Sequence, residues 1–566
     1  MVKNLTGQLV DIDQSRIYPA ELVVDKGKIV SIRPITGSEQ AHAHQGPFIM
    51  PGLIDAHVHI ESSMLVPREF ARLAVVHGTV ATVSDPHEIA NVCGLPGVEF
   101  MINNARETPF KFYFGAPSCV PATPFETAGA RLDPEAVERM LSKKEIHYLS
   151  EMMNFPGVLH GDPEVLQKIA AARRLGKPVD GHAPGLRGAS ARQYIQAGIS
   201  TDHECFTREE ALEKLSYGMK IIIREGSAAK NFDALIDLLN EYPEDMMFCS
   251  DDKHPDSLVN GHINRLCARA VAKDIPLFHV LRAACLNPVI HYGLDVGLLR
   301  VGDSADFIVV QDLREFQVLQ TFIGGELVSA AGKSLLPARA ADRDHATDPI
   351  NNFHARPKSA ADFKIKAETF LRSSDPPGFC TLDVIEALDG QLITNHAQGR
   401  ARVVDRELQS NPAEDVLKFV AVNRYRPSPV AVAFIRNFGL EYGALASSVA
   451  HDSHNIVAIG VDDESIARAV NLIISRKGGV SCVGKQEEIL LPLPVGGLMS
   501  QEDGYEVASA YTTIDLMAKR LGTKLSAPFM TLSFMALLVI PHLKLSDLGL
   551  FDGDTFQFLE PFRISQ

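Results

Sequence analysis

The chain has 566 residues, of which 46% are hydrophobic, 22% charged and 7% aromatic. This length excludes a disulfide-stapled minidomain, and the composition is that of a folded globular protein rather than a disordered one. The formal net charge is −15, from 55 basic and 70 acidic residues, and the sequence has no run of Lys and Arg. Nucleic acid and anionic membrane surfaces are therefore not expected partners.

Neither a membrane span nor a secretion signal is predicted. The longest apolar stretch, residues 529–540, is closed by a proline on each side and is shorter than the ~20 residues that cross a bilayer. The N-terminus has acidic residues early and no apolar segment followed by a cleavage site. The eight cysteines lie far apart without a CxxC pair, which argues against a disulfide framework and favours a reducing cytoplasm.

Two segments far apart in the sequence, residues 1–50 and 305–331, share a pattern typical of β-strands. Residues 1–50 alternate short apolar runs with turn residues, and Asp25, Lys26 and Gly27 suit a hairpin turn. Similar runs return at residues 305–331. We predict one small composite β-domain made of residues 1–50 and 290–335.

Residues 51–289 repeat a pattern of an apolar strand, a polar strand end and a helix. The eight predicted strands lie within residues 53–60, 79–87, 111–120, 147–154, 177–185, 198–204, 219–227 and 246–252. His, Asp, Glu and Ser recur at their carboxyl ends, the face that carries the active site in (β/α)8 barrels. The fold class is therefore predicted as α/β, a TIM-like (β/α)8 barrel.

A polar connecting region follows at about residue 332, and the texture then changes to mixed α and β. Residues 463–475 keep helical spacing of apolar side chains, with Asp462 or Asp463 as the cap and Gly478 at the end. We predict an additional C-terminal α+β domain over residues 345–566.

Two histidines, His57 and His59, fall two residues apart on the first predicted barrel strand. Side chains at i and i+2 point to the same face, so both imidazoles, with Asp55 beside them, should enter one barrel mouth. This pair alone is a weak signal. Other predicted strand ends carry further metal-binding side chains: Glu151, His182, His203 and Asp251. Together the six predict a mixed nitrogen and oxygen site for two divalent metal ions, with zinc, iron or manganese all suitable.

Several other polar residues near the predicted strand ends have two interpretations each. Their donors and acceptors could bind a substrate, or they could form ion pairs, caps and turns of the fold. Those at the ends of the barrel strands are Glu61, Ser62, His87, Glu88, Arg224, Glu225 and Ser227. For His87 and Glu88 the alternatives are metal binding, proton transfer or a loop cap. In the predicted C-terminal domain, His451, Asp452 and His454 are either a solvated turn or part of a loop that closes over the barrel mouth.

The segment PGLIDAHVHIESSM, residues 51–64, resembles the opening of the amidohydrolase superfamily, and its HIESSM ending is similar to the bacterial adenine deaminases of that superfamily. Further segments resemble the same enzymes: GTVATVSDPHEIANVCG, SEMMNFPGV, DGHAPG, TDHE, REGSAAKN, FCSDDKHP and SSVAHDSHNI. The resemblance implies a barrel with a composite β-domain and a C-terminal domain. It also implies hydrolysis of adenine to hypoxanthine and ammonia in purine salvage, by a dinuclear centre of manganese or iron, with zinc as the alternative, in a homo-oligomer, with a dimer favoured.

One position departs from the wider superfamily, many members of which bridge their metals with a carbamylated lysine on the fourth strand. This chain has Glu151 there. In this respect it resembles the adenine deaminases rather than the wider superfamily. The same similarity implies that Asp251 binds metal and shuttles the proton when a bridging hydroxide attacks C6, and that Asp252 lies near the base. The order of these two acids stays open from sequence.

Other functions fit parts of the pattern. A cyclic amide or ureide hydrolase, a deaminase of another purine, and a metal-bearing binding protein without turnover are the alternatives. The phosphate-binding GxxxxGK[ST] loop, the PCxxC deaminase signature and the GxSxG elbow are absent from the sequence.

Overall fold

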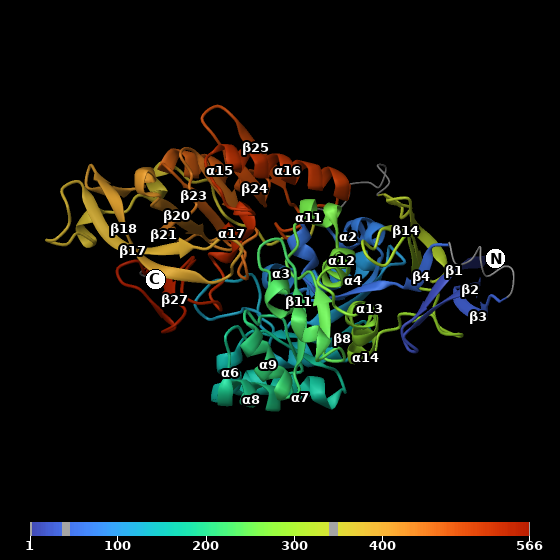
Figure 1. Ribbon diagram of the computed structural model, residues 1–566. Helices are drawn as coiled ribbons and strands as arrows, with labels where there is room; N and C mark the ends of the chain where they lie inside the picture. Colours follow the sequence, from blue (N-terminus) through green and yellow to red (C-terminus); the bar gives the residue numbers. More distant parts are fainter. Residues whose placement is uncertain (1–2, 37–45, 339–348, 565–566) are drawn as a thin grey trace.

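The computed structural model describes residues 3–36, 46–338 and 349–564. A barrel occupies the middle of the molecule, with a sheet built around the N-terminus on one side and the C-terminal domain on the other (Figure 1). Residues 339–348, within the predicted connecting region, lie outside the described residues.

The barrel consists of eight parallel strands in chain order, in one sheet from β5 to β9 and another from β10 to β12. Backbone hydrogen bonds from Ser200 to Val179 (2.9 Å) and from Asp251 to His57 (3.0 Å) join the two sheets into a closed ring. This confirms the predicted barrel. The strands are β5 (Leu53–Val58), β6 (Thr79–Ser84), β7 (Lys111–Ala116), β8 (Ile146–Met152), β9 (Val179–Gly181), β10 (Thr201–Asp202), β11 (Lys220–Arg224) and β12 (Met246–Cys249).

Helices surround this ring because each strand is buried on both faces and needs an apolar cover. Every residue of β5, β6 and β12 is buried. The helices are α2 (Pro67–Ala74), α3 (His87–Cys93), α4 (Leu95–Ala105), α5 (Pro134–Leu141), α6 (Phe155–His160), α7 (Pro163–Arg174), α8 (Gly188–Gln196), α9 (Arg208–Ser216), α10 (Phe232–Leu235), α11 (Pro255–Asn260), α12 (Ile263–Ala272), α13 (Leu277–Leu281) and α14 (Asn287–Tyr292).

Strands from before and after the barrel form one sheet, in the order β16-β15-β14-β13-β4-β1-β2-β3. The antiparallel pairing of β13 with β4 joins the two groups. At the predicted hairpin turn, Lys26 and Gly27 have φ of 49° and 78°. The strands are β1 (Lys3–Asp11), β2 (Arg16–Asp25), β3 (Lys28–Pro34), β4 (Phe48–Pro51), β13 (Phe307–Val310), β14 (Val318–Ile323), β15 (Glu326–Ala330) and β16 (Lys333–Ser334).

The C-terminal domain is built on a nine-stranded sheet in the order β19-β18-β17-β21-β20-β23-β22-β24-β25, next to a small sheet of β26, β27 and β28. Its strands are β17 (Phe379–Ala387), β18 (Thr394–Val404), β19 (Glu407–Gln409), β20 (Leu417–Val422), β21 (Ala431–Arg436), β22 (Ala444–Ser447), β23 (Ile456–Gly460), β24 (Gly479–Val483), β25 (Glu488–Pro492), β26 (Leu543–Ser546), β27 (Gly549–Asp552) and β28 (Gln557–Phe558). Its helices are α15 (Asp463–Ser475), α16 (Gly504–Arg520) and α17 (Pro528–Phe534), and Asp462 caps α15 by accepting from the Ser465 amide.

The barrel and the C-terminal domain share one hydrophobic core. At their boundary a Cβ on Gly496, which has φ of +63°, would lie 2.3 Å from the side chain of Ile89 on α3, so only glycine allows this close approach. An ion pair of 2.7 Å between Arg72 and Asp503 adds a polar tie. The two parts are therefore held together by packing. Among the described residues, no helix has the length and apolar character needed to cross a bilayer.

Candidate metal centre

The six predicted metal ligands meet at the carboxyl ends of the barrel strands, and each is at most 5% exposed. They come from five different strand ends: His57 and His59 from β5, Glu151 from β8, His182 after β9, His203 after β10, and Asp251 after β12. Parallel strands end at the same edge, so residues far apart in sequence converge there.

Glu151 lies between two sets of imidazoles. Its Oε2 is 2.8 Å from His182 Nδ1 and 3.2 Å from His203 Nε2. Its other oxygen, Oε1, is 3.3 Å from His59 Nε2. A carboxylate with one oxygen facing each set of ligands has the arrangement needed to bridge two cations.

Asp251 faces the first set of imidazoles with one oxygen. Its Oδ1 lies 3.2 Å from His59 Nε2 and 3.6 Å from His57 Nε2, while its Oδ2 accepts from Arg224 at 3.0 Å. The residue has φ of +52°, a conformation that costs a non-glycine residue ~1 kcal/mol or more. The surrounding contacts hold this carboxylate in place against that strain.

The donor set fits divalent cations. Three groups of ligand atoms, in each of which all atoms lie within 4.8 Å of one another, are formed by His57, His59 and Asp251, by His57, Glu151 and His203, and by His182, His203 and Glu204. Burial alone would raise the pKa of Glu151, but the charge of His182 and the hydrogen bonds from His182, His203 and His59 hold it well below its usual range. These contacts favour the ionised form of Glu151, which is the form that binds metal.

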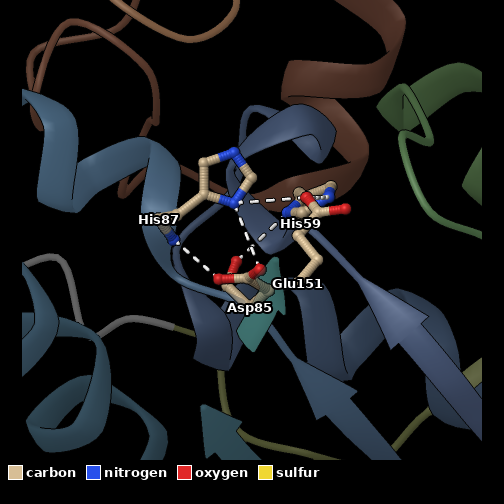
Figure 2. A group of neighbouring side chains, drawn as sticks. All are labelled: His59, Asp85, His87 and Glu151. Carbon is tan, nitrogen blue, oxygen red and sulfur yellow. Dashed lines mark hydrogen bonds and ion pairs between the residues drawn. The ribbon is translucent and has the colours of Figure 1, made fainter. Parts of the chain in front are cut away.

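His87, at the start of α3, connects this centre to a second polar cluster. Its Nδ1 is 3.2 Å from Asp85 Oδ2 and 3.5 Å from Glu151 Oε1. Figure 2 shows His59, Asp85, His87 and Glu151 gathered around this point. The other ring nitrogen of His87, Nε2, faces away from Glu151. It lies 3.3 Å from both Glu88 Oε1 and Asp452 Oδ1.

Arg224 is fully buried and supports the centre through two carboxylates. It holds Glu204 by a two-pronged contact, with Nη2 to Oε2 at 3.2 Å, and it donates to Asp251. Glu204 Oε1 lies 3.4 Å from His203 Nε2. Glu204 was not among the predicted site residues, although it directly follows His203.

Two predicted substrate-binding residues lie away from the centre. Glu225 pairs with Arg269 at 2.7 Å on the outer side of the barrel. Ser227 Oγ accepts from the backbone of His254, the residue that precedes α11. In the structure both therefore make contacts within the fold, and neither lines the cavity beside the ligands. Asp55 also lies behind the ligands, paired with His262 at 2.8 Å.

A loop of the C-terminal domain, residues 448–455, covers the barrel mouth. His451 Nε2 is 3.1 Å from both Asp252 Oδ1 and Glu88 Oε1, and its Nδ1 is 2.6 Å from Ser533 Oγ on α17. Burial lowers the pKa of His451, but the charges of Glu88 and Asp252 outweigh it and raise the pKa to about 9. His454 pairs with the other oxygen of Glu88. The loop is thus part of the site rather than a solvated turn.

Ser62, Asp252 and Glu61 lie on the barrel side of this contact. Ser62 donates to Asp252, and Asp252 in turn contacts His451. Glu61 accepts from the Ile89 amide at 3.1 Å, and burial raises its pKa to about 7. Ser62 and Asp252 therefore face the C-terminal loop, while Glu61 supports the start of α3.

A narrow cavity of about 20 Å³ lies between the centre and the loop. This is room for about one or two water molecules. Apolar side chains complete its wall beside the ligands, namely Met153 from the barrel and Leu392 and Leu537 from the C-terminal domain. Met153 also lines a larger cavity of about 510 Å³ that includes Phe125 and Phe155.

Comparison with known proteins agrees with this architecture. Residues 48–328 match the amidohydrolase family, and residues 391–557 match the adenine deaminase C-terminal domain. An adenine deaminase of Sulfurovum sp. is 55% identical over 98% of each chain. Those of Methanosarcina acetivorans and Salinibacter ruber are 51% and 53% identical over 99% of this chain and 100% and 99% of theirs.

Proposed function

Since the chain belongs to the adenine deaminase family, we propose that its barrel mouth hydrolyses adenine to hypoxanthine and ammonia with two divalent metal ions. The position of Glu151 carries this proposal, because its two oxygens face separate sets of imidazoles. One ion would be held by His57, His59 and Asp251 and the other by His182 and His203, with Glu151 shared. Manganese or iron suits this mixed set, and zinc is the alternative.

The chemistry needs a nucleophile near neutral pH and a proton path to the leaving amine. Bound divalent ions supply the first by lowering the pKa of water. Asp251 provides the second: its Oδ1 faces the site and can take a proton from the attacking water and return it to the departing nitrogen. Arg224, on Oδ2, keeps that carboxylate oriented.

The remaining walls suit a flat, partly apolar base. Met153, Leu392 and Leu537 can pack against the ring faces, while Asp252 and His451 offer polar atoms at its edge. The cavity of about 20 Å³ is too small for a purine, so binding requires the apolar wall formed by Leu392 and Leu537 to move away from the barrel.

The test is adenine turnover by protein loaded separately with manganese, iron or zinc. We expect loss of adenine absorbance with equimolar hypoxanthine and ammonia, and loss of that activity on chelation. No turnover in any metal form, with metal bound and the fold intact, would contradict the proposal. It would favour another purine or a cyclic amide as substrate.

We also propose a cytoplasmic homo-oligomer, with a dimer favoured, that acts in purine salvage. All eight cysteines are free, which suits a reducing compartment. Light scattering of the metal-loaded protein tests the oligomeric state, and a monomer at micromolar concentration would contradict it.

A further inference from the structure

We propose that Asp452, from the C-terminal domain, selects the free base by accepting a hydrogen bond from the ring N–H that adenine has and N9-substituted adenines lack. This inference rests on the proposed function and adds a specificity residue to it. It gives the C-terminal domain a defined part in the reaction.

The first observation is an unpaired acceptor. Asp452 is 2% exposed and lines the narrow cavity. Its Oδ1 faces His87 Nε2 at 3.3 Å, while its Oδ2 has no hydrogen-bond partner among the described residues. A buried carboxylate oxygen without a donor is costly, and native proteins nearly always satisfy such atoms. The cavity is therefore where its donor is expected.

The second observation is the position of Asp452 relative to the centre. The imidazole of His87 separates the two carboxylates, with Nδ1 3.5 Å from Glu151 Oε1 and Nε2 3.3 Å from Asp452 Oδ1. Adenine carries N–H donors at the amine on C6 and on its five-membered ring. The amine must lie at the centre, where C6 reacts. The N–H of the five-membered ring lies at the opposite end of the base, and the proposal places it beside Asp452.

The third observation is that the loop is held firmly. His451, the neighbour of Asp452, contacts Asp252, Glu88 and Ser533, and the loop also places His454 on Glu88. A substituent on N9 would remove the donor for Asp452 and would also point into this packed loop. Nucleosides should therefore be rejected for a polar and a steric reason.

The experiment compares adenine with 9-methyladenine in the metal-loaded full chain, using kcat/KM and equilibrium binding. We expect the wild type to prefer adenine by at least about 100-fold. Asp452→Ala should lower kcat/KM for adenine about 10- to 100-fold and reduce the preference to within about 10-fold, with metal content unchanged. Asp452→Asn, whose amide oxygen can still accept, should be intermediate.

Ser453→Ala is the matched control, because Ser453 is buried in the same loop and its hydroxyl accepts from Asn455 rather than lining the cavity. It should keep the wild-type preference. Equal use of both bases by the wild type would overturn the proposal. So would an Asp452→Ala protein that loses activity but keeps the full preference, or one that loses a metal ion. Absence of adenine turnover in the wild type would instead contradict the proposed function, and the binding preference would still test Asp452.

Discussion

Replacing Arg224 with lysine keeps a buried positive charge but removes the guanidinium fork. Arg224 holds both oxygens of Glu204 and also donates to Asp251 Oδ2 at 3.0 Å. A lysine ammonium is a point charge on a flexible stem and cannot reproduce the fork. We expect Asp251 to lose its fixed orientation while the fold is retained.

The lost contact is a hydrogen bond between charged groups, for which ~1.5–3 kcal/mol is typical. Each 1.36 kcal/mol corresponds to a factor of about ten in rate, so kcat should fall about 10- to 150-fold. KM should change less than about threefold, because Arg224 contacts the proton-transfer residue rather than the base. Arg224→Gln should lower kcat further than Arg224→Lys does, since breaking a buried ion pair by removing one partner typically costs ~3–5 kcal/mol.

The assay is steady-state adenine deamination with metal content measured on the same samples. Arg72→Lys is the matched control, because Arg72 also contacts two carboxylates, Glu69 and Asp503, but lies away from the ligands. It should lower thermal stability and leave kcat unchanged. Wild-type kcat in Arg224→Lys, or a raised KM at constant kcat, would refute the reasoning.

Three further predictions concern the metal ligands, the metal itself and a buried lysine, Lys544. Glu151→Gln and Asp251→Asn should each lower kcat by about 10³-fold or more with unchanged circular dichroism, and near-normal activity in either would contradict that residue's assignment. Removal of metal should lower the melting temperature and its return should restore it, since ligands that bind only the folded state stabilise it; an unchanged melting temperature would contradict the site. Lys544, on β26, is buried and donates to the carbonyl oxygens of Leu392 and Phe534 at 2.6 and 2.9 Å. Burial lowers its pKa from 10.5 to about 7, so the unfolded chain holds the proton more tightly in that range. The free energy of unfolding of the wild type relative to Lys544→Met should therefore rise with pH between about 7 and 10.5, by up to ~1.4 kcal/mol per unit, and urea titrations at several pH values that show a flat difference would contradict this.

Strand periodicity explains why most of the centre could be predicted from sequence. His57 lies on β5 and His59 directly follows that strand, and both face the centre as an i and i+2 pair should. The same alternation argues against Glu225 as a substrate-binding residue. Glu225 follows Arg224, which faces the centre, and it points the other way, to Arg269. The two-residue period of a strand, applied to β11, predicts that Arg224 and Glu225 face opposite sides.

Periodicity fails where a strand is too short to enforce it. Glu204 follows His203, so alternation would point it away from the centre, yet it contacts Arg224 and lies 3.4 Å from His203 Nε2. The strand β10 covers only Thr201–Asp202. His203 and Glu204 therefore lie past the end of the strand, where alternation no longer holds. The place of Glu204 in the site therefore follows from its contacts in the folded structure and not from the spacing of residues in the sequence.

The C-terminal contribution depends on packing over still longer distances. His451 meets Asp252, 199 residues earlier, and Asp452 meets His87, 365 residues earlier. No repeat or spacing in the sequence encodes these pairs, because the shared hydrophobic core of the barrel and the C-terminal domain creates them. The resemblance to a family could suggest the loop, but only the structure places its side chains.

His87 makes the two parts of the site interdependent. Its two ring nitrogens face Glu151 on one side and Asp452 on the other, so a change at either carboxylate alters the hydrogen bonding available to the same imidazole. A barrel without residues 349–564 would keep every predicted metal ligand. It would lose Leu392, Leu537, His451 and Asp452 from the cavity wall, and it would expose the core surface around Ile89. Under the proposed role of Asp452, the metal ligands alone would not give selective deamination, because the residue that selects the base belongs to the other domain.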